Sequence, residues 1–135
     1  MAAKSGNQLY RVHPRHTSAI ERAYRGWFLS GFPGLKFGPN QNLTKSEAIV
    51  SLVNGVELKG VNPDSLKVYS DRSVIPNFAV SAIATATDLI IVVNYPARDR
   101  LSPLPDITRA EISALIYQTL VAINRAKAID SPDIV

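Results

Sequence analysis

The chain contains an internal repeat, and this repeat restricts the possible folds more than any other feature. The stretch "LTKSEAIVSLV" at residues 43–53 aligns with "ITRAEISALIY" at residues 107–117. Further matches lie upstream, in the pairs Pro39 and Pro103, Phe32-Pro33 and Tyr95-Pro96, Ala19-Ile20 and Ala82-Ile83, and Ala23 and Ala86. The offset is 63 residues up to the prolines at 33 and 96 and 64 residues beyond, which indicates one inserted residue in the intervening loop. Each copy is therefore expected to form the same unit and to stack on the other.

Each copy predicts a helix, an irregular loop and a second helix. In copy one, "TSAIERAYRGWFL" has apolar residues at helical spacing, and Ser18 with Glu21 fits a capping box. The loop "GFPGLKFGPNQN" is rich in Gly, Pro and Asn. Thr44 with Glu47 fits a second capping box, which opens a helix running to about Gly55.

Copy two follows the same plan. A helix is expected from about Pro76 or Asn77, with Phe78, Ile83 and Ala86 buried, and Asp71 is expected to cap a turn before it. The loop "VVNYPARDRLSPLPD" follows. Thr108 with Glu111 then caps a helix whose apolar stripe is predicted to hold Ile112, Leu115, Ile116 and Leu120.

The predicted fold class is all-α, with two helix–loop–helix repeats packed around a shared core and extended N- and C-terminal tails. All 135 residues are expected to form a single domain, 1–135, with repeat one at about 14–58, repeat two at about 68–125 and a C-terminal tail at 126–135. The absence of cysteine excludes disulfides and thiolate metal sites. No apolar run is long enough to cross a bilayer, and the N-terminal segment lacks the hydrophobic stretch of a secretory signal.

The charge of the chain is unevenly distributed. Residues 1–45 hold seven Lys or Arg and one Glu, a balance of +6, whereas residues 46–135 hold eight basic and ten acidic residues, a balance of −2. The first third could attract an anionic partner, or it could be an ordinary solvated face.

A basic residue stands at the first helical position of both repeated boxes. Lys45 and Arg109 contribute nothing to capping, and the helix macrodipole slightly disfavours a cation at this end. Anion binding is one explanation for both residues, and a solvated or salt-bridged helix start is the other.

These motifs resemble the S-layer homology repeat, most closely its cyanobacterial members. The resemblance covers about residues 14–125. It rests on "ITRAE" at 107–111 after a Pro-containing loop, on "GFPGLKFGPNQNLTKSEA" at 31–48, and on "YSDRSVIPNFAVSAIATAT" at 69–87. Such repeats usually occur in threes around a pseudo-threefold axis, but residues 1–13 are too short for a third copy.

The resemblance implies a non-catalytic module that anchors a protein to the cell envelope. Its partner would be an anionic, often pyruvylated, cell-wall polysaccharide or peptidoglycan-linked glycan, bound in grooves between repeats. Arg109 matches the arginine that contacts the acidic sugar, and Lys45 stands in the equivalent place without the planar fork of a guanidinium. Ligand-binding candidates are therefore Arg109, Lys45, the loop glycines Gly31 and Gly34, and the aromatic residues Trp27 and Tyr95. Trp27 fits either a core position or a stacking platform for sugars.

An intracellular protein-interaction or assembly module is the alternative function. Self-association or another protein would then complete the missing third repeat. The predicted location is the wall side of the outer membrane if a leader or larger chain is missing, and the cytoplasm otherwise.

Other functions find little support in the sequence. It contains no nucleophile elbow or phosphate-binding loop, and no acid–base pair emerges, so no enzyme and no cofactor is predicted. His13 and His16 have no third ligand nearby, so no metal site is predicted. No helix carries a Lys/Arg stripe, so nucleic acid is not an expected partner.

Overall fold

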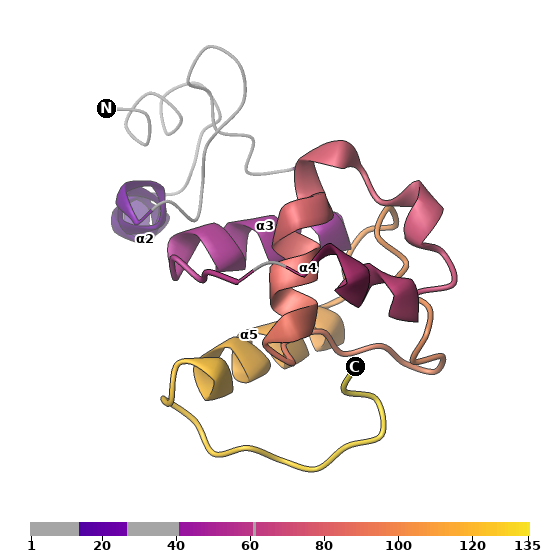
Figure 1. Ribbon diagram of the computed structural model, residues 1–135. Helices are drawn as coiled ribbons and strands as arrows, with labels where there is room; N and C mark the ends of the chain where they lie inside the picture. The colour runs from indigo at the N-terminus through magenta and orange to yellow at the C-terminus, as the bar shows by residue number, and fades with distance from the viewer. Residues whose placement is uncertain (1–13, 27–40, 61) are drawn as a thin grey trace.

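The computed structural model describes residues 14–26, 41–60 and 62–135. Its elements are the helices α2 (Pro14–Arg25), α3 (Lys45–Gly55), α4 (Val80–Asp88) and α5 (Arg109–Ala122), and the 3-10 helices η1 (Pro63–Val68), η2 (Arg72–Val74) and η3 (Asn77–Ala79) (Figure 1). The described part contains no strand and only two isolated β-bridges, so the predicted all-α class is confirmed.

The repeat is visible as two pairs of equivalent helices. α3 and α5 begin at equivalent residues, 45 and 109, and η3 with α4 covers residues 77–88, the counterpart of α2 at 14–25. α3 ends at Gly55, as predicted. α2 begins at Pro14, so Ser18 lies inside the helix and its predicted capping box is wrong. Proline suits the first helical position because its fixed φ is helical and it lacks the amide hydrogen that would be left unpaired there.

The second helix of each repeat, α3 in repeat one and α5 in repeat two, is capped by a threonine. The Thr108 hydroxyl accepts from the Glu111 amide at 3.1 Å, and the Glu111 carboxylate accepts from the Thr108 amide at 2.8 Å. In copy one the Thr44 hydroxyl accepts from the Glu47 amide at 3.2 Å, but it also donates to the Glu47 carboxylate at 3.1 Å. The reciprocal box is therefore complete only at α5.

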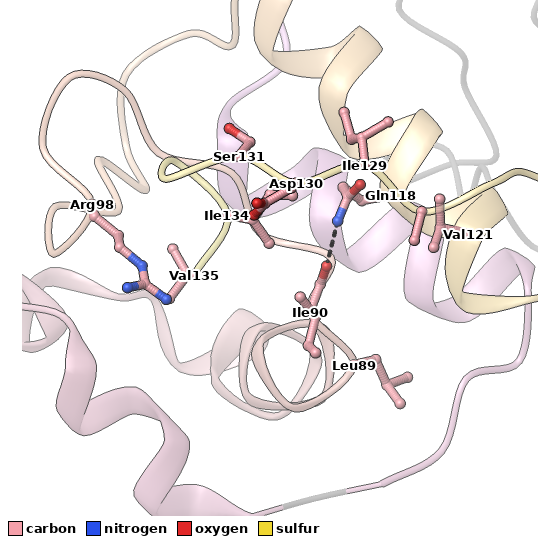
Figure 2. A pocket seen from close by; sticks show the side chains of 11 residues that line it. Leu89, Ile90, Arg98, Gln118, Val121, Ile129, Asp130, Ser131, Ile134 and Val135 are labelled. Atoms are coloured by element: carbon pink, nitrogen blue, oxygen red, sulfur yellow. Dashed lines mark hydrogen bonds between the residues drawn. The ribbon is translucent and has the colours of Figure 1, made fainter.

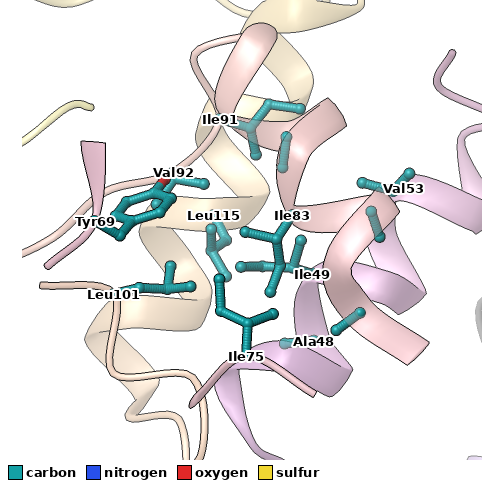
Figure 3. Close-up of a cluster of buried hydrophobic side chains, with 13 residues drawn as sticks. Ala48, Ile49, Val53, Tyr69, Ile75, Ile83, Ile91, Val92, Leu101 and Leu115 are labelled. Carbon is teal, nitrogen blue, oxygen red and sulfur yellow. The ribbon is translucent and has the colours of Figure 1, made fainter. Parts of the chain in front are cut away.

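The core is shared between the repeats, as predicted. Its largest fully buried apolar side chains are Ile49 from α3, Ile83 from α4, Leu115 from α5, and Tyr69, Ile91, Val92 and Leu101 from the connecting segments (Figure 3). α4 packs closely on α3, the second helix of the other repeat. Burial raises the pKa of the Tyr69 phenol to about 12, although its hydrogen bond with Thr87 acts in the opposite direction.

Three of the apolar positions predicted from helical periodicity are not buried. Phe78 is 62% exposed, and Ile116 and Leu120 are 45% and 38% exposed, whereas Ile83, Ala86 and Leu115 are buried as predicted. Periodicity identifies an apolar stripe, but it does not show whether a neighbouring element covers that stripe.

The C-terminal tail returns to the core along the loop of its own repeat. Val93 and Ile134 form an antiparallel bridge, and the Val135 amide donates to the Val92 carbonyl at 3.0 Å. The Tyr117 hydroxyl donates to the Lys127 carbonyl at 2.5 Å, which fixes the start of the tail against α5. The tail therefore packs against the loop that follows α4.

The complete capping box makes Thr108 a local determinant of stability. We expect Thr108→Ala to lower the free energy of unfolding by about 1 kcal/mol, because the Glu111 amide loses its acceptor. Urea denaturation measures this change. Thr108→Ser keeps the hydroxyl and serves as the control. An equal loss for both variants would contradict the capping role.

Candidate functional site

The two repeated helix starts lie side by side. Thr44 and Asp106 form an antiparallel bridge, and the Ile107 amide donates to the Leu43 carbonyl at 2.7 Å. The Asn42 amide group donates to the Asp106 carboxylate at 2.8 Å, so an acid stands between two positive helix ends. The residues just before the two caps thus join the repeats directly.

The loop of repeat two closes the start of α3. The Lys45 amide donates to the Pro105 carbonyl at 3.4 Å, and the Ser46 amide donates to the Pro103 carbonyl at 3.1 Å. The Ser46 hydroxyl also donates to the Pro103 carbonyl, at 2.8 Å. The first amides of a helix have no partner within the helix, and here the other repeat supplies their acceptors.

Lys45 is part of this closure. Its ammonium donates to the Val93 carbonyl at 3.0 Å and to the Asn94 side-chain oxygen at 2.7 Å, and the residue is only 3% exposed. Burial lowers the pKa of Lys45 below its ordinary value of 10.5, although the charges of Glu111 and Asp71 act in the opposite direction. The lysine therefore serves as a buried brace between α3 and the second loop.

Asn94, which accepts the hydrogen bond from Lys45, also binds the rest of the loop and the C-terminal tail. Its side-chain nitrogen donates to the Arg98 carbonyl at 2.8 Å, and its backbone amide donates to the Asp133 carbonyl at 2.9 Å. Tyr95 follows with a cis bond to Pro96 and is 82% exposed. A ring as exposed as that of Tyr95 is accessible to a ligand.

The start of α5 carries the same donors without the same partners. Arg109 is exposed, and its guanidinium makes no hydrogen bond or ion pair with another residue of the described part. Within the same ranges, the Arg109 and Ala110 amides also have no acceptor. The equivalent amides of Lys45 and Ser46 both have acceptors. The two helix starts therefore differ in whether a neighbouring segment accepts hydrogen bonds from their first amides.

The six predicted ligand residues fall into two groups. Arg109, Lys45 and Tyr95 are described, and only Arg109 and Tyr95 are exposed. Gly31, Gly34 and Trp27 lie outside the described residues. Anion binding by Arg109 or Lys45 stays a prediction.

Sequence reasoning did not identify two acidic or amide side chains that fix the loop of repeat two. Asn94 was not among the candidate residues, yet its side-chain oxygen is the acceptor for Lys45. The Asp71 carboxylate accepts from the Leu101 and Ser102 amides at 3.0 and 2.8 Å, so it fixes the distal part of the loop. Asp71 makes no side-chain capping bond at η2, so the predicted turn cap is wrong.

A separate hollow of about 420 Å³ lies between α5, the end of α4 and the C-terminal tail (Figure 2). The Gln118 side chain donates to the Ile90 carbonyl there at 2.8 Å, and its own oxygen is buried without a partner. Arg109, Lys45 and Tyr95 do not line this hollow.

Two further classes of feature are not found in the described part of the chain. No group of three or more His, Cys, Asp or Glu side chains is placed to hold a metal ion. None of the described helices combines the length and the apolar character that crossing a bilayer requires.

Comparison with known proteins finds a similarity to one surface-layer protein. Over 119 residues, or 87% of this chain, the sequence is 28% identical to the "Surface-layer 125 kDa protein" of Lysinibacillus sphaericus. The chain spans about a tenth of that protein's length (10%). No protein-family model matches the chain, and no solved structure matches it. The similarity associates the chain with a cell-surface protein.

Because the buried ammonium of Lys45 joins α3 to the second loop, we expect its removal to lower the stability of the fold. We expect Lys45→Met to lower the free energy of unfolding by about 1–3 kcal/mol, because the Val93 carbonyl and the Asn94 oxygen lose a charged donor. Urea denaturation at neutral pH measures the effect. Lys59→Met, at an exposed lysine, is the matched control. A similar small change in both variants would contradict the brace.

The lowered pKa of Lys45 predicts a pH dependence of stability. Between the lowered folded value and 10.5, the unfolded chain holds a proton that the folded chain has released, so the free energy of unfolding rises with pH. Tyr69 acts in the opposite direction above its unfolded value of 10.0, because its folded pKa is higher. Unfolding curves measured from neutral pH up to pH 10.0, the unfolded value of Tyr69, should show a Lys45 contribution that rises once the folded lysine begins to lose its proton. The difference between the parent and Lys45→Met isolates this contribution, and a difference that does not change with pH would contradict it.

Proposed function

We propose that this chain is an S-layer-homology-type module that anchors a protein to the cell envelope by binding an acidic wall glycan at the start of α5. One observation carries the proposal. At the start of α3, the basic side chain and the first two amides donate hydrogen bonds to the loop of repeat two. The same donors are present at the start of α5, where they have no acceptor in the described part of the chain. The similarity to a surface-layer protein supports the same cellular role.

The donors at the start of α5 suit a carboxylate ligand. The guanidinium of Arg109 offers a planar fork that can bind both oxygens of a carboxylate. The free amides of Arg109 and Ala110 lie at the positive end of the helix, where anions are stabilised. A pyruvate ketal on a sugar carries one such carboxylate. Tyr95 supplies an exposed ring on the loop that Asn94 holds, and such a ring can stack on a sugar face.

Lys45 has a different role in this proposal. A ligand would have to displace two hydrogen bonds from an ammonium that is already buried. We therefore assign the glycan contact to Arg109 and the joining of the repeats to Lys45. The substitution of lysine for arginine fits this division, since a point charge suffices for two acceptors in a closed pocket.

Binding to purified wall sacculi tests the proposal. We expect the parent chain to sediment with the sacculi, and we expect Arg109→Gln to lower the binding constant about tenfold, since a hydrogen bond to a charged group contributes roughly 1.5–3 kcal/mol. Salt should weaken the binding, because the ionic contact is exposed. Mild acid, which removes pyruvate ketals, should abolish it.

Arg125→Gln is the matched control, because Arg125 is an exposed arginine just beyond the other end of α5. It should sediment like the parent. If the parent stays in solution, or if both variants lose binding equally, the assignment of the glycan to Arg109 is wrong.

A further inference from the structure

The hollow between α5, the end of α4 and the C-terminal tail, here called the tail hollow, has the dimensions of a small-molecule site. Its volume of about 420 Å³ is within the usual range for such sites. Most of the residues that line it are apolar, among them Leu89, Ile90, Val121 and Ile129 (Figure 2). Ile90 and Ile129 are 56% and 57% exposed, so a molecule in the hollow would shield apolar surface from water.

The tail hollow also has a specific polar requirement. Gln118 lines it and is only 6% exposed. The side-chain nitrogen of Gln118 donates to the Ile90 carbonyl at 2.8 Å, and because a carbonyl can only accept, this bond fixes which end of the amide is the oxygen. That oxygen is buried and has no hydrogen-bond partner in the described part of the chain. A buried acceptor without a donor is unfavourable, so the site calls for one N–H or O–H group.

The backbone beside Gln118 is strained. Ile90 has a φ of 59°, a left-handed conformation that is rare for a β-branched residue. The Gln118 side chain holds the carbonyl of this residue, and the Ile90 side chain remains exposed at the hollow. Strained residues that their surroundings hold in place are common where proteins bind ligands. The strain therefore coincides with the unpaired oxygen and the exposed apolar wall.

The C-terminal tail crosses the hollow between two points of attachment. The Tyr117 hydroxyl donates to the Lys127 carbonyl, and the Asn94 amide donates to the Asp133 carbonyl. Among the described residues, 128–131 make no hydrogen bond with any segment outside the tail. The middle of the tail can therefore move outward without breaking either attachment, which gives a molecule a route to the buried oxygen of Gln118.

We propose that the tail hollow binds a small apolar molecule that carries one N–H or O–H donor, with this donor bonded to the side-chain oxygen of Gln118. A water molecule bonded to the same oxygen would leave Ile90 and Ile129 exposed, whereas a ligand with an apolar body covers them. The site goes beyond the proposed function and does not rest on it, since Arg109 does not line the hollow.

A pair of probes of the same shape tests the proposal with the parent chain. Indole is an apolar ring system with one N–H donor, and benzofuran has an oxygen acceptor in place of that group. NMR titration should show indole binding about fivefold more tightly than benzofuran, the effect of one hydrogen bond between neutral groups. The amide signals of Ile90, Ile129 and Ser131 should shift, and those of Thr44 and Lys59, which do not line the hollow, should not.

Three variants assign the binding to the hollow. Gln118→Leu should bind the two probes equally, because the oxygen that distinguishes them is gone. Val121→Trp should abolish binding of both probes, because its ring fills the hollow. Leu120→Trp is the matched control, since Leu120 is the preceding residue of the same helix and does not line the hollow. It should bind indole like the parent.

Each of three results would overturn the proposal. The first is a parent chain that does not bind indole up to the solubility limit of the probe. The second is equal binding of indole and benzofuran by the parent, which would mean that the Gln118 oxygen takes no part. The third is unchanged indole binding by Val121→Trp, which would place the probe elsewhere. The first two results need only the parent chain, and no wall material is used, so failure here leaves glycan binding at Arg109 untouched.

Discussion

The contact between the Lys45 ammonium and the loop of repeat two joins the two halves of this fold. A lysine that is 3% exposed has lost most of its hydration, and two neutral oxygens, from Val93 and Asn94, replace it. Asn94 in turn holds the Arg98 carbonyl, and Asp71 holds the far end of the same loop. The position of the second loop therefore depends on a residue 48 positions earlier in the chain.

The contact also explains why one motif has two structural outcomes. At α3 the basic residue and the first two amides face carbonyl and amide oxygens of the following repeat. At α5 no following repeat exists within the described chain, and the same donors face outward. The local sequence is nearly the same in both places, so the difference comes from the neighbour and not from the helix.

The sequence predicted the parts of the fold that depend on local chemistry. The threonine caps at Thr44 and Thr108 and the end of α3 at Gly55 follow from hydrogen bonding and propensity within a few residues. Exposure of Phe78 and burial of Lys45 were not predictable in this way, because both depend on which distant segment lies above them. The contribution of Asn94 was hidden for the same reason, since its partner is in the other repeat.

A basic residue at a repeated helix start therefore has no fixed role in an array of this kind. Where another repeat follows, its loop supplies acceptors and the cation becomes a brace, for which a lysine is sufficient. At α5 the described part of the chain supplies no such acceptors, so the cation and the free amides are open to water or to a ligand, and a guanidinium offers the better geometry for a carboxylate. The pairing of lysine with the closed start and arginine with the open start agrees with that division. The proposed ligand site is therefore at the start of α5, where the described part of the chain leaves these donors unpaired.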